Sequence, residues 1–235
     1  MPHLDIQQTL IRILVLTFSL SVHEYAHARV AYALGDDTAA RMGRLTLNPA
    51  QHIDPLGALA FILVGFGWAR PVPVNPVRFS RTKVKTMRSG MMKVAIAGPI
   101  SNLIIAFFSN LILQVFSLLY LVISKQPLMS SNNPLINILI SIIYAFYFSN
   151  IFLAVFNLLP IPPLDGSKVL GVFLPARAYD KYMSLQRYST MIMLGVILLG
   201  GSILSGIMMA ITRPISFIIS QPVNWLFAWL TQQII

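Results

Sequence analysis

The sequence predicts an all-α polytopic membrane protein with about four or five transmembrane helices and one short re-entrant, strand-like loop. Of the 235 residues, 56% are hydrophobic and only 10% are charged, and the mean hydropathy is +0.73, whereas soluble domains are about 25% charged. Several apolar stretches reach the roughly 20 residues that cross a bilayer as a helix. We expect a single membrane-embedded domain over residues 1–235, with a core at about 9–175 and C-terminal helices at about 189–235.

The first apolar stretch covers residues 9–34. It lacks the basic segment with which a signal peptide begins, so we expect a retained helix. Later apolar stretches cover residues 91–123, 135–159 and 189–211, and each reaches the length of a transmembrane helix. Residues 214–235 are a weaker candidate, either for a fifth transmembrane helix or for a helix that lies in the membrane interface.

The apolar stretch at residues 56–68 is too short to cross a bilayer as a helix. Apolar stretches of about 10 to 14 residues more often form re-entrant or interfacial segments. Pro71, Pro73 and Pro76 follow it, and each proline fixes φ and disfavours helix in the residue before it. Extended backbone at membrane depth is stable only against protein or in a wet cavity. We therefore expect a re-entrant, strand-like loop.

Basic residues are unevenly divided between the two sides of these predicted helices. If the re-entrant loop returns to its own side, that side receives 14 of the 17 Lys and Arg residues, and the other side keeps Arg12, Lys125 and Arg213. Basic loops face the cytoplasm, so we expect the N-terminus outside and the basic side in the cytoplasm. The same bias accounts for the net charge of +10 without nucleic acid as a partner.

The motif His23-Glu24-Tyr25-Ala26-His27 lies near the end of the first predicted helix. Residues i and i+4 share one helix face, so both imidazoles can bind one metal ion while Glu24 approaches a water bound to that ion. Zinc proteases use this arrangement, with the carboxylate accepting the proton of the water. Ionisable residues inside a transmembrane helix are costly, and they indicate function.

Catalytic zinc needs a third protein ligand and one open position. The chain has no cysteine, which leaves His3, His52, Asp54 and Asp165 as the main candidates. Asp165 ends the proline-rich stretch 157–165, where the third predicted helix must stop, so its carboxylate lies at the depth of the histidines. The alternative is that Asp165 is an N-cap residue of the next helix. His52 and Asp54 fit a loop turn or a hydrogen bond to a zinc-binding histidine.

Together, the motif HExxH at residues 23–27 and the motif NxxPxxPLDG at residues 157–166 resemble the site-2 protease family of intramembrane zinc metalloproteases. Residues 43–49, 52–57 and 98–102 are also similar to segments of the compact members of that family. The resemblance covers residues 9–175. The longest predicted extramembrane segment, residues 36–55, is too short for a PDZ domain, so the chain resembles the form without one.

The resemblance implies that His23, His27 and Asp165 bind one zinc ion per chain and that Glu24 is the general base. It also implies that Asn157 steadies the substrate or the developing oxyanion, although an asparagine at this depth can equally bond a neighbouring helix. The implied activity is that of a metalloendopeptidase in regulated intramembrane proteolysis. Such an enzyme hydrolyses peptide bonds in or near the transmembrane helices of membrane proteins.

The implied partners are a protein substrate with a transmembrane helix and the lipid bilayer, while the oligomeric state is left open. We expect an integral protein of the cell membrane with its active site toward the cytoplasm. A helical substrate must unwind locally, and free backbone groups at Val72 or Val74 would allow it to pair with the re-entrant loop. Two alternatives are a metal-ion transporter, which needs a polar path across the membrane, and a non-catalytic relative that binds membrane helices.

Overall fold

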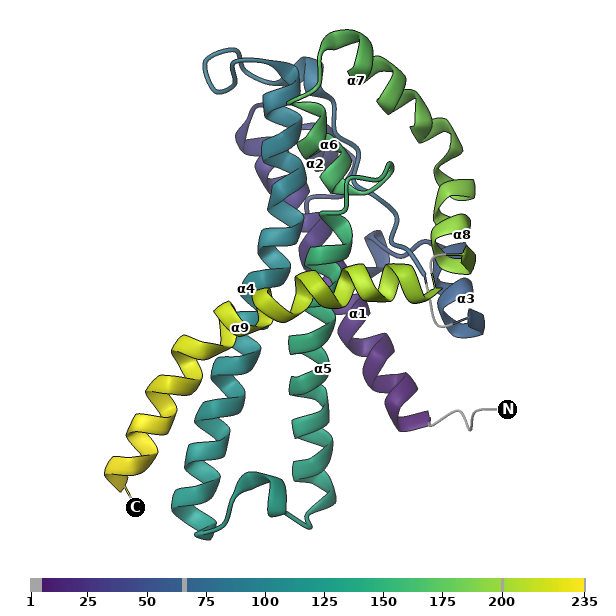
Figure 1. Cartoon of the computed structure of the whole chain (residues 1–235). Coiled ribbons are helices and arrows are strands. Elements are labelled where there is room, and N and C mark those ends of the chain that lie inside the picture. The colour runs from purple at the N-terminus through teal and green to yellow at the C-terminus, as the bar shows by residue number, and fades with distance from the viewer. Residues whose placement is uncertain (1–5, 65–66, 200, 235) are drawn as a thin grey trace.

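The computed structural model describes residues 6–64, 67–199 and 201–234. In this part of the chain the secondary structure is helical, and the only β-type pairing is an isolated bridge, which confirms the predicted all-α class. The α-helices, shown in Figure 1, are α1 (Ile6–Ala33), α2 (Thr38–Arg41), α3 (Pro55–Val64), α4 (Met87–Ser124), α5 (Pro134–Asn157), α6 (Asp165–Gly171), α7 (Ala176–Met183), α8 (Ser189–Leu199) and α9 (Gly201–Ile234). Short 3₁₀ turns are η1 (Pro49–Gln51), η2 (Pro76–Arg78), η3 (Leu128–Ser130) and η4 (Ser184–Tyr188).

Within the described ranges, four helical stretches are long and apolar enough to cross a membrane. They are α1, α4, α5 and the part of α9 from Leu204 to Gln233. The first three agree with the helices predicted at residues 9–34, 91–123 and 135–159. Large apolar side chains such as Leu14, Phe108 and Phe148 are exposed on these helices, as expected for surfaces that face lipid.

The fourth transmembrane helix predicted at residues 189–211 includes residue 200, which lies outside the described residues. On either side of it, α8 ends at Leu199 and α9 begins at Gly201, and the two helices run in different directions in Figure 1. The part of α9 that is long and apolar enough to cross a membrane, Leu204–Gln233, contains most of residues 214–235, the weaker candidate. Pro214 and Pro222 both lie inside α9, and prolines are tolerated in transmembrane helices.

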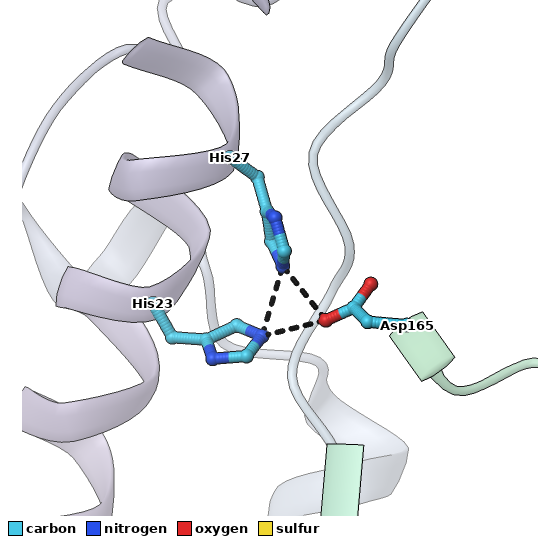
Figure 2. Close-up of side chains that lie close together, drawn as sticks. All are labelled: His23, His27 and Asp165. Atoms are coloured by element: carbon cyan, nitrogen blue, oxygen red, sulfur yellow. Dashed lines mark hydrogen bonds and ion pairs between the residues drawn. The ribbon is translucent and has the colours of Figure 1, made fainter. Parts of the chain in front are cut away.

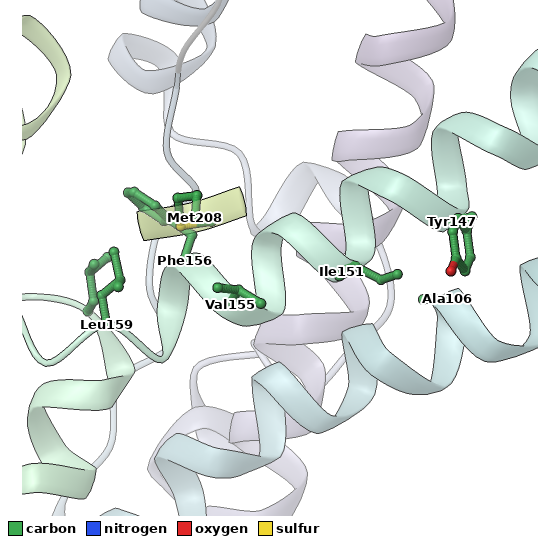
Figure 3. Packing of buried hydrophobic residues seen from close by; sticks show 8 residues of the cluster. Ala106, Tyr147, Ile151, Val155, Phe156, Leu159 and Met208 are labelled. Carbon is green, nitrogen blue, oxygen red and sulfur yellow. The ribbon is translucent and has the colours of Figure 1, made fainter. Parts of the chain in front are cut away.

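Helix α4 is the centre of the bundle and packs against α1, α5, α6 and α9. The largest buried apolar cluster lies where α5 meets α4 and α9, and Figure 3 shows its side chains. Its members are Ala106, Tyr147, Ile151, Val155, Phe156, Leu159, Leu164 and Met208. This cluster fixes the end of α5, from which the chain turns toward α6.

The segment between α3 and α4 returns to its own side, as predicted. Ile53 and Ala69 form an antiparallel bridge, and the Arg70 N–H donates to the His52 carbonyl at 2.8 Å. Between them, α3 has only 10 residues, too few to cross a bilayer. The loop is therefore re-entrant, but it consists of a short helix followed by residues 69–75, here called the proline segment, which form no extended strand ladder.

One end of the bundle gathers the loops that carry most of the basic residues (Figure 1). There, Lys83 Nζ donates to the Ala33 carbonyl at 2.8 Å, at the end of α1. Near the start of α4, Arg88 Nη1 donates to the Leu174 carbonyl at 3.1 Å and so joins α4 to the segment before α7. Lys125 caps the other end of α4. The basic loops thus lie together, as the predicted charge asymmetry requires.

Candidate metal centre

Three of the predicted site residues converge on one point inside the bundle (Figure 2). His23 Nε2 lies 2.9 Å from His27 Nε2, and Asp165 Oδ2 lies 3.2 Å from His23 Nε2 and 3.0 Å from His27 Nε2. All three side chains are buried. In the described part of the chain, this is the one group of three or more metal-binding side chains.

Helix α1 presents both histidines from one face, and α4 approaches that face closely at Gly98. A Cβ atom added at Gly98 would lie 2.5 Å from both His23 Cε1 and His27 Nε2. No side chain fits at such distances, so only glycine lets α4 pass this close to the imidazoles. In the sequence, Gly98 stands out only as part of the segment 98–102 that resembles the family.

Asp165 reaches the histidines from the first turn of α6. The N-cap residue of that helix is Leu164, which makes no side-chain capping bond, so the alternative of an N-cap aspartate is wrong. Instead, Asp165 Oδ2 faces the imidazoles, and Asp165 Oδ1 accepts a hydrogen bond from Lys168 Nζ at 3.0 Å. Tyr182 anchors the preceding turn by donating to the Pro160 carbonyl at 2.9 Å, and burial raises the pKa of its hydroxyl.

The hydrogen bonds behind the imidazoles leave their Nε2 atoms free to bind a metal. His27 Nδ1 lies 2.7 Å from the Val94 carbonyl, which only accepts, so Nδ1 carries the proton of the neutral ring. His23 Nδ1 lies 2.6 Å from Asn102 Oδ1, which is also an acceptor. Two Nε2 electron pairs and one carboxylate oxygen of Asp165 therefore face one another, and a shared cation would stabilise all three.

This donor set fits zinc. Nitrogen and oxygen ligands of tetrahedral zinc, at about 2.0–2.2 Å from the ion, are about 3.4 Å apart. The separations of 2.9, 3.0 and 3.2 Å in this cluster are close to that value. Two imidazoles and one carboxylate leave one of four positions open, which is the ligand count of catalytic rather than structural zinc sites.

Glu24 is also buried, and the proline segment fixes its carboxylate. The Val72 N–H donates to Glu24 Oε2 at 2.8 Å, so the side chain is held beside the turn of α1 that carries His23 and His27 instead of pointing freely into solvent. This bond contradicts the idea that the Val72 backbone is free to pair with an extended substrate. The carboxylate is the partner that this N–H has within the fold.

Buried charged residues of the loop between α1 and α3 hold the proline segment at both ends. Arg44 Nη2 donates to the Arg70 carbonyl at 2.7 Å, and Asp36 Oδ2 accepts from the Asn75 N–H at 2.6 Å. Burial lowers the pKa of the Arg44 guanidinium from its ordinary value. Nothing in the local sequence links Arg44 or Asp36 to partners 26 and 39 residues away, so neither residue could be assigned this role from the sequence.

The other candidates for the third ligand lie elsewhere. His52 Nε2 donates to the Thr46 carbonyl at 2.8 Å, and Asp54 accepts from the Gly57 N–H at 2.8 Å at the start of α3. Both residues thus shape the loop, as the simpler interpretation had it. His3 lies outside the described residues.

Asn157 is the last residue of α5, and its Nδ2 donates to the Leu153 carbonyl one turn earlier, at 2.9 Å. Among the hydrogen bonds of the described residues, none joins Asn157 to the three clustered side chains. The Oδ1 atom of Asn157 is not used by this bond. The contact of the Asn157 side chain with a substrate or an oxyanion stays a prediction.

Comparison with known proteins agrees with this geometry. A sequence model of Peptidase family M50 matches residues 11–202. Over 182 residues the chain is 38% identical to "Putative zinc metalloprotease YwhC" of Bacillus subtilis, covering 77% of each chain. It is 32% identical over 153 residues to "Putative zinc metalloprotease Rip2" of Mycolicibacterium smegmatis, covering 63% of this chain and 51% of that one.

The Rip2 protein of Mycobacterium tuberculosis (strain Erdman) is similar at 30% identity over 157 residues, which cover 65% of this chain and 52% of that one. No solved structure matches. The family match extends from the first turns of α1 past the end of α8, so it includes both histidines and the aspartate of the cluster. The chain therefore belongs to peptidase family M50, the site-2 protease family of zinc metalloproteases, and is an integral membrane protein.

Proposed function

We propose that this protein is a zinc-dependent intramembrane endopeptidase that hydrolyses peptide bonds in or beside the transmembrane helices of other membrane proteins. One observation carries the proposal: the metal-binding cluster is buried on a helix that is itself long and apolar enough to span the membrane. His23 precedes the end of α1 at Ala33 by ten residues, or about 15 Å along the helix axis. The cluster thus lies inside the helix bundle and not in a loop outside it.

The proposed division of labour follows from the contacts. His23, His27 and Asp165 would hold the metal, and zinc bound there would supply a Lewis acid that polarises the scissile carbonyl and makes water more acidic. Glu24 accepts a proton from the attacking water and passes it to the leaving amine. The Val72 N–H keeps the Glu24 carboxylate oriented through both transfers.

A substrate helix has to unwind before its carbonyls become accessible, because they are hydrogen-bonded within the helix. Asn157, at the end of α5, is the proposed polar contact for the unwound segment, since its Oδ1 is not used by the bond to Leu153. The Val72 N–H is excluded from this role because Glu24 occupies it.

The proposed setting is the cell membrane, with the site toward the cytoplasm. The basic loops gather at the end of the bundle where α1 ends and α4 begins, and such loops face the cytoplasm in most membrane proteins. The partners are then the bilayer itself and a membrane protein that offers a transmembrane helix. Nucleic acid has no part in this proposal.

The test compares Glu24→Gln with the wild-type chain in cells, followed by purification of both. We expect Glu24→Gln to retain its zinc while membrane proteins that are substrates accumulate uncut, as measured by quantitative proteomics of the membrane fraction. Asp180→Asn, which alters an exposed acid in α7, is the matched control and should leave both unchanged. Cleavage that persists in Glu24→Gln would rule out Glu24 as the base.

A further inference from the structure

Behind the metal cluster lies a chain of buried side-chain amides that the proposed reaction does not use. His23 Nδ1 lies 2.6 Å from Asn102 Oδ1 on α4. Asn102 Nδ2 donates to Asn150 Oδ1 on α5 at 2.8 Å. Asn150 Nδ2 donates at 2.8 Å both to the Phe146 carbonyl and to Ser19 Oγ on α1. Asn102, Asn150 and Ser19 are each 0% exposed.

The hydrogen bonds of this series of amides all run in one donor-to-acceptor direction, and a backbone carbonyl fixes that direction. The Phe146 carbonyl can only accept, so the amide atom of Asn150 that faces it must be the NH₂ group. The Asn150 oxygen therefore faces Asn102, which must donate a hydrogen bond to it from its own NH₂ group. The oxygen of Asn102 then faces His23, so that Nδ1 of His23 carries the proton and Nε2 is unprotonated.

We propose that Asn102 and Asn150 are positioning residues that hold His23 in the one neutral tautomer able to bind the metal through Nε2. The proposal rests on the proposed function, because it concerns the same metal site. Reversing the Asn102 amide would place two donors or two acceptors against each other at both of its ends. Both amides are 0% exposed, and unpaired buried polar groups are costly.

A purely structural role is the competing account, since buried asparagines also hold transmembrane helices together. Helix α4 offers a matched control for that role, two turns beyond Asn102. Asn110 is also buried, and its Nδ2 donates to Asn224 Oδ1 on α9 at 3.3 Å. It joins two helices as Asn102 does, but it has no contact with a metal ligand among the described hydrogen bonds.

The two accounts differ in what they expect of Asn102→Asp. A carboxylate accepts but does not donate, so it loses the bond to Asn150 and keeps the acceptor that His23 needs. If Asn102 only joins helices, Asn102→Asp should be as harmful as Asn102→Leu. If Asn102 sets the tautomer, Asn102→Asp should preserve the metal site, because an oxygen faces His23 in either orientation.

The experiment measures the zinc affinity of the full chain in detergent micelles by competition with a chelator. We expect Asn102→Leu to weaken zinc binding by about 10- to 100-fold, as is typical when a hydrogen-bond partner of a metal ligand is removed. Asn150→Leu should weaken it in the same direction by a smaller factor. Asn110→Leu and Asn102→Asp should bind zinc within about twofold of the wild type.

A double variant tests the donor-to-acceptor direction of these hydrogen bonds. Combining Asn150→Leu with Asn102→Asp should add no further loss, because an aspartate at 102 no longer needs Asn150 to orient it. Zinc binding that is as weak in Asn102→Asp as in Asn102→Leu, or equally weak in Asn110→Leu, would overturn the proposal. If Asn102→Leu does not fold, Asn150→Leu and the double variant still decide, since neither removes the acceptor that faces His23.

Failure of the proposed function gives a different pattern of results. If His23→Ala binds zinc as tightly as the wild type, the metal site itself is wrong. If zinc affinities follow the expected order but the wild-type chain cleaves no membrane protein, the endopeptidase assignment fails and the roles of Asn102 and Asn150 stand.

Discussion

Gly98→Ala is expected to disable the metal site through a single methyl group. The new Cβ would lie 2.5 Å from His23 Cε1 and from His27 Nε2 and 2.6 Å from His23 Nε2. Ordinary contact needs about 3.4 Å, so the imidazoles or α4 must move by about 0.9 Å. Metal ligands tolerate shifts of only about 0.2 Å. Misplacement on the scale of 1 Å typically costs about 100-fold in rate.

The assays for this variant are zinc content after purification and cleavage of a substrate found by the proteomic comparison. We expect zinc binding to fall and cleavage to drop by about 100-fold or more. Gly206→Ala is the matched control, because it adds the same methyl to a membrane helix where nothing lies within 4 Å. Alanine is the better helix former by about 1 kcal/mol, so the control should fold at least as well as the wild type.

A Gly98→Ala chain that binds zinc and cleaves like the wild type would refute this reasoning. It would mean that α4 does not pass this close to the imidazoles. The placement of the cluster between α1 and α4 would then be wrong. A variant that loses zinc while its helix content and thermal unfolding stay near those of the control would support it.

Three further predictions concern the partners of the site. Val72→Pro removes the N–H that holds Glu24 and should lower cleavage by about 10- to 100-fold with zinc retained, whereas Val72→Ala keeps the N–H and should be nearly silent in the same cleavage assay. Lys168→Met removes the partner of Asp165 Oδ1 and should weaken zinc binding about 10-fold by chelator competition, with Lys168→Arg restoring it. If free zinc is at 100 times its Kd, chelating it should lower the free energy of unfolding by about 2.7 kcal/mol. A thermal unfolding experiment would show this as a lower midpoint temperature. A midpoint that still depends on zinc in His23→Ala would contradict the ligand assignment.

The sequence predicted what depends on local spacing. His23 and His27 share a helix face because they are four residues apart, and the transmembrane helices follow from runs of apolar residues. The change of direction between α8 and α9 was missed, since a run of apolar residues carries no information on helix direction. The depth and direction of Asp165 came from the family resemblance as much as from the prolines before it.

The contacts that orient the site were beyond the sequence because they join distant residues. Val72 and Glu24 are 48 residues apart, and Asn102 lies 79 residues from His23. Nothing in the pattern around Asn102 or Asn150 distinguishes an amide that orients a ligand from one that joins two helices. Only the packing of α1, α4 and α5 brings these side chains into one hydrogen-bonded chain.

The proline segment illustrates how a non-helical backbone can lie beside a buried site in a membrane protein. Pro71 and Pro73 have no N–H to satisfy, while the N–H groups of Arg70, Val72 and Asn75 are taken by His52, Glu24 and Asp36. Backbone donors left unpaired in an apolar environment cost several kcal/mol each. Pro71 and Pro73 thus reduce the number of backbone N–H groups that need a hydrogen-bond partner, and the N–H of Val72 between them orients the proposed base.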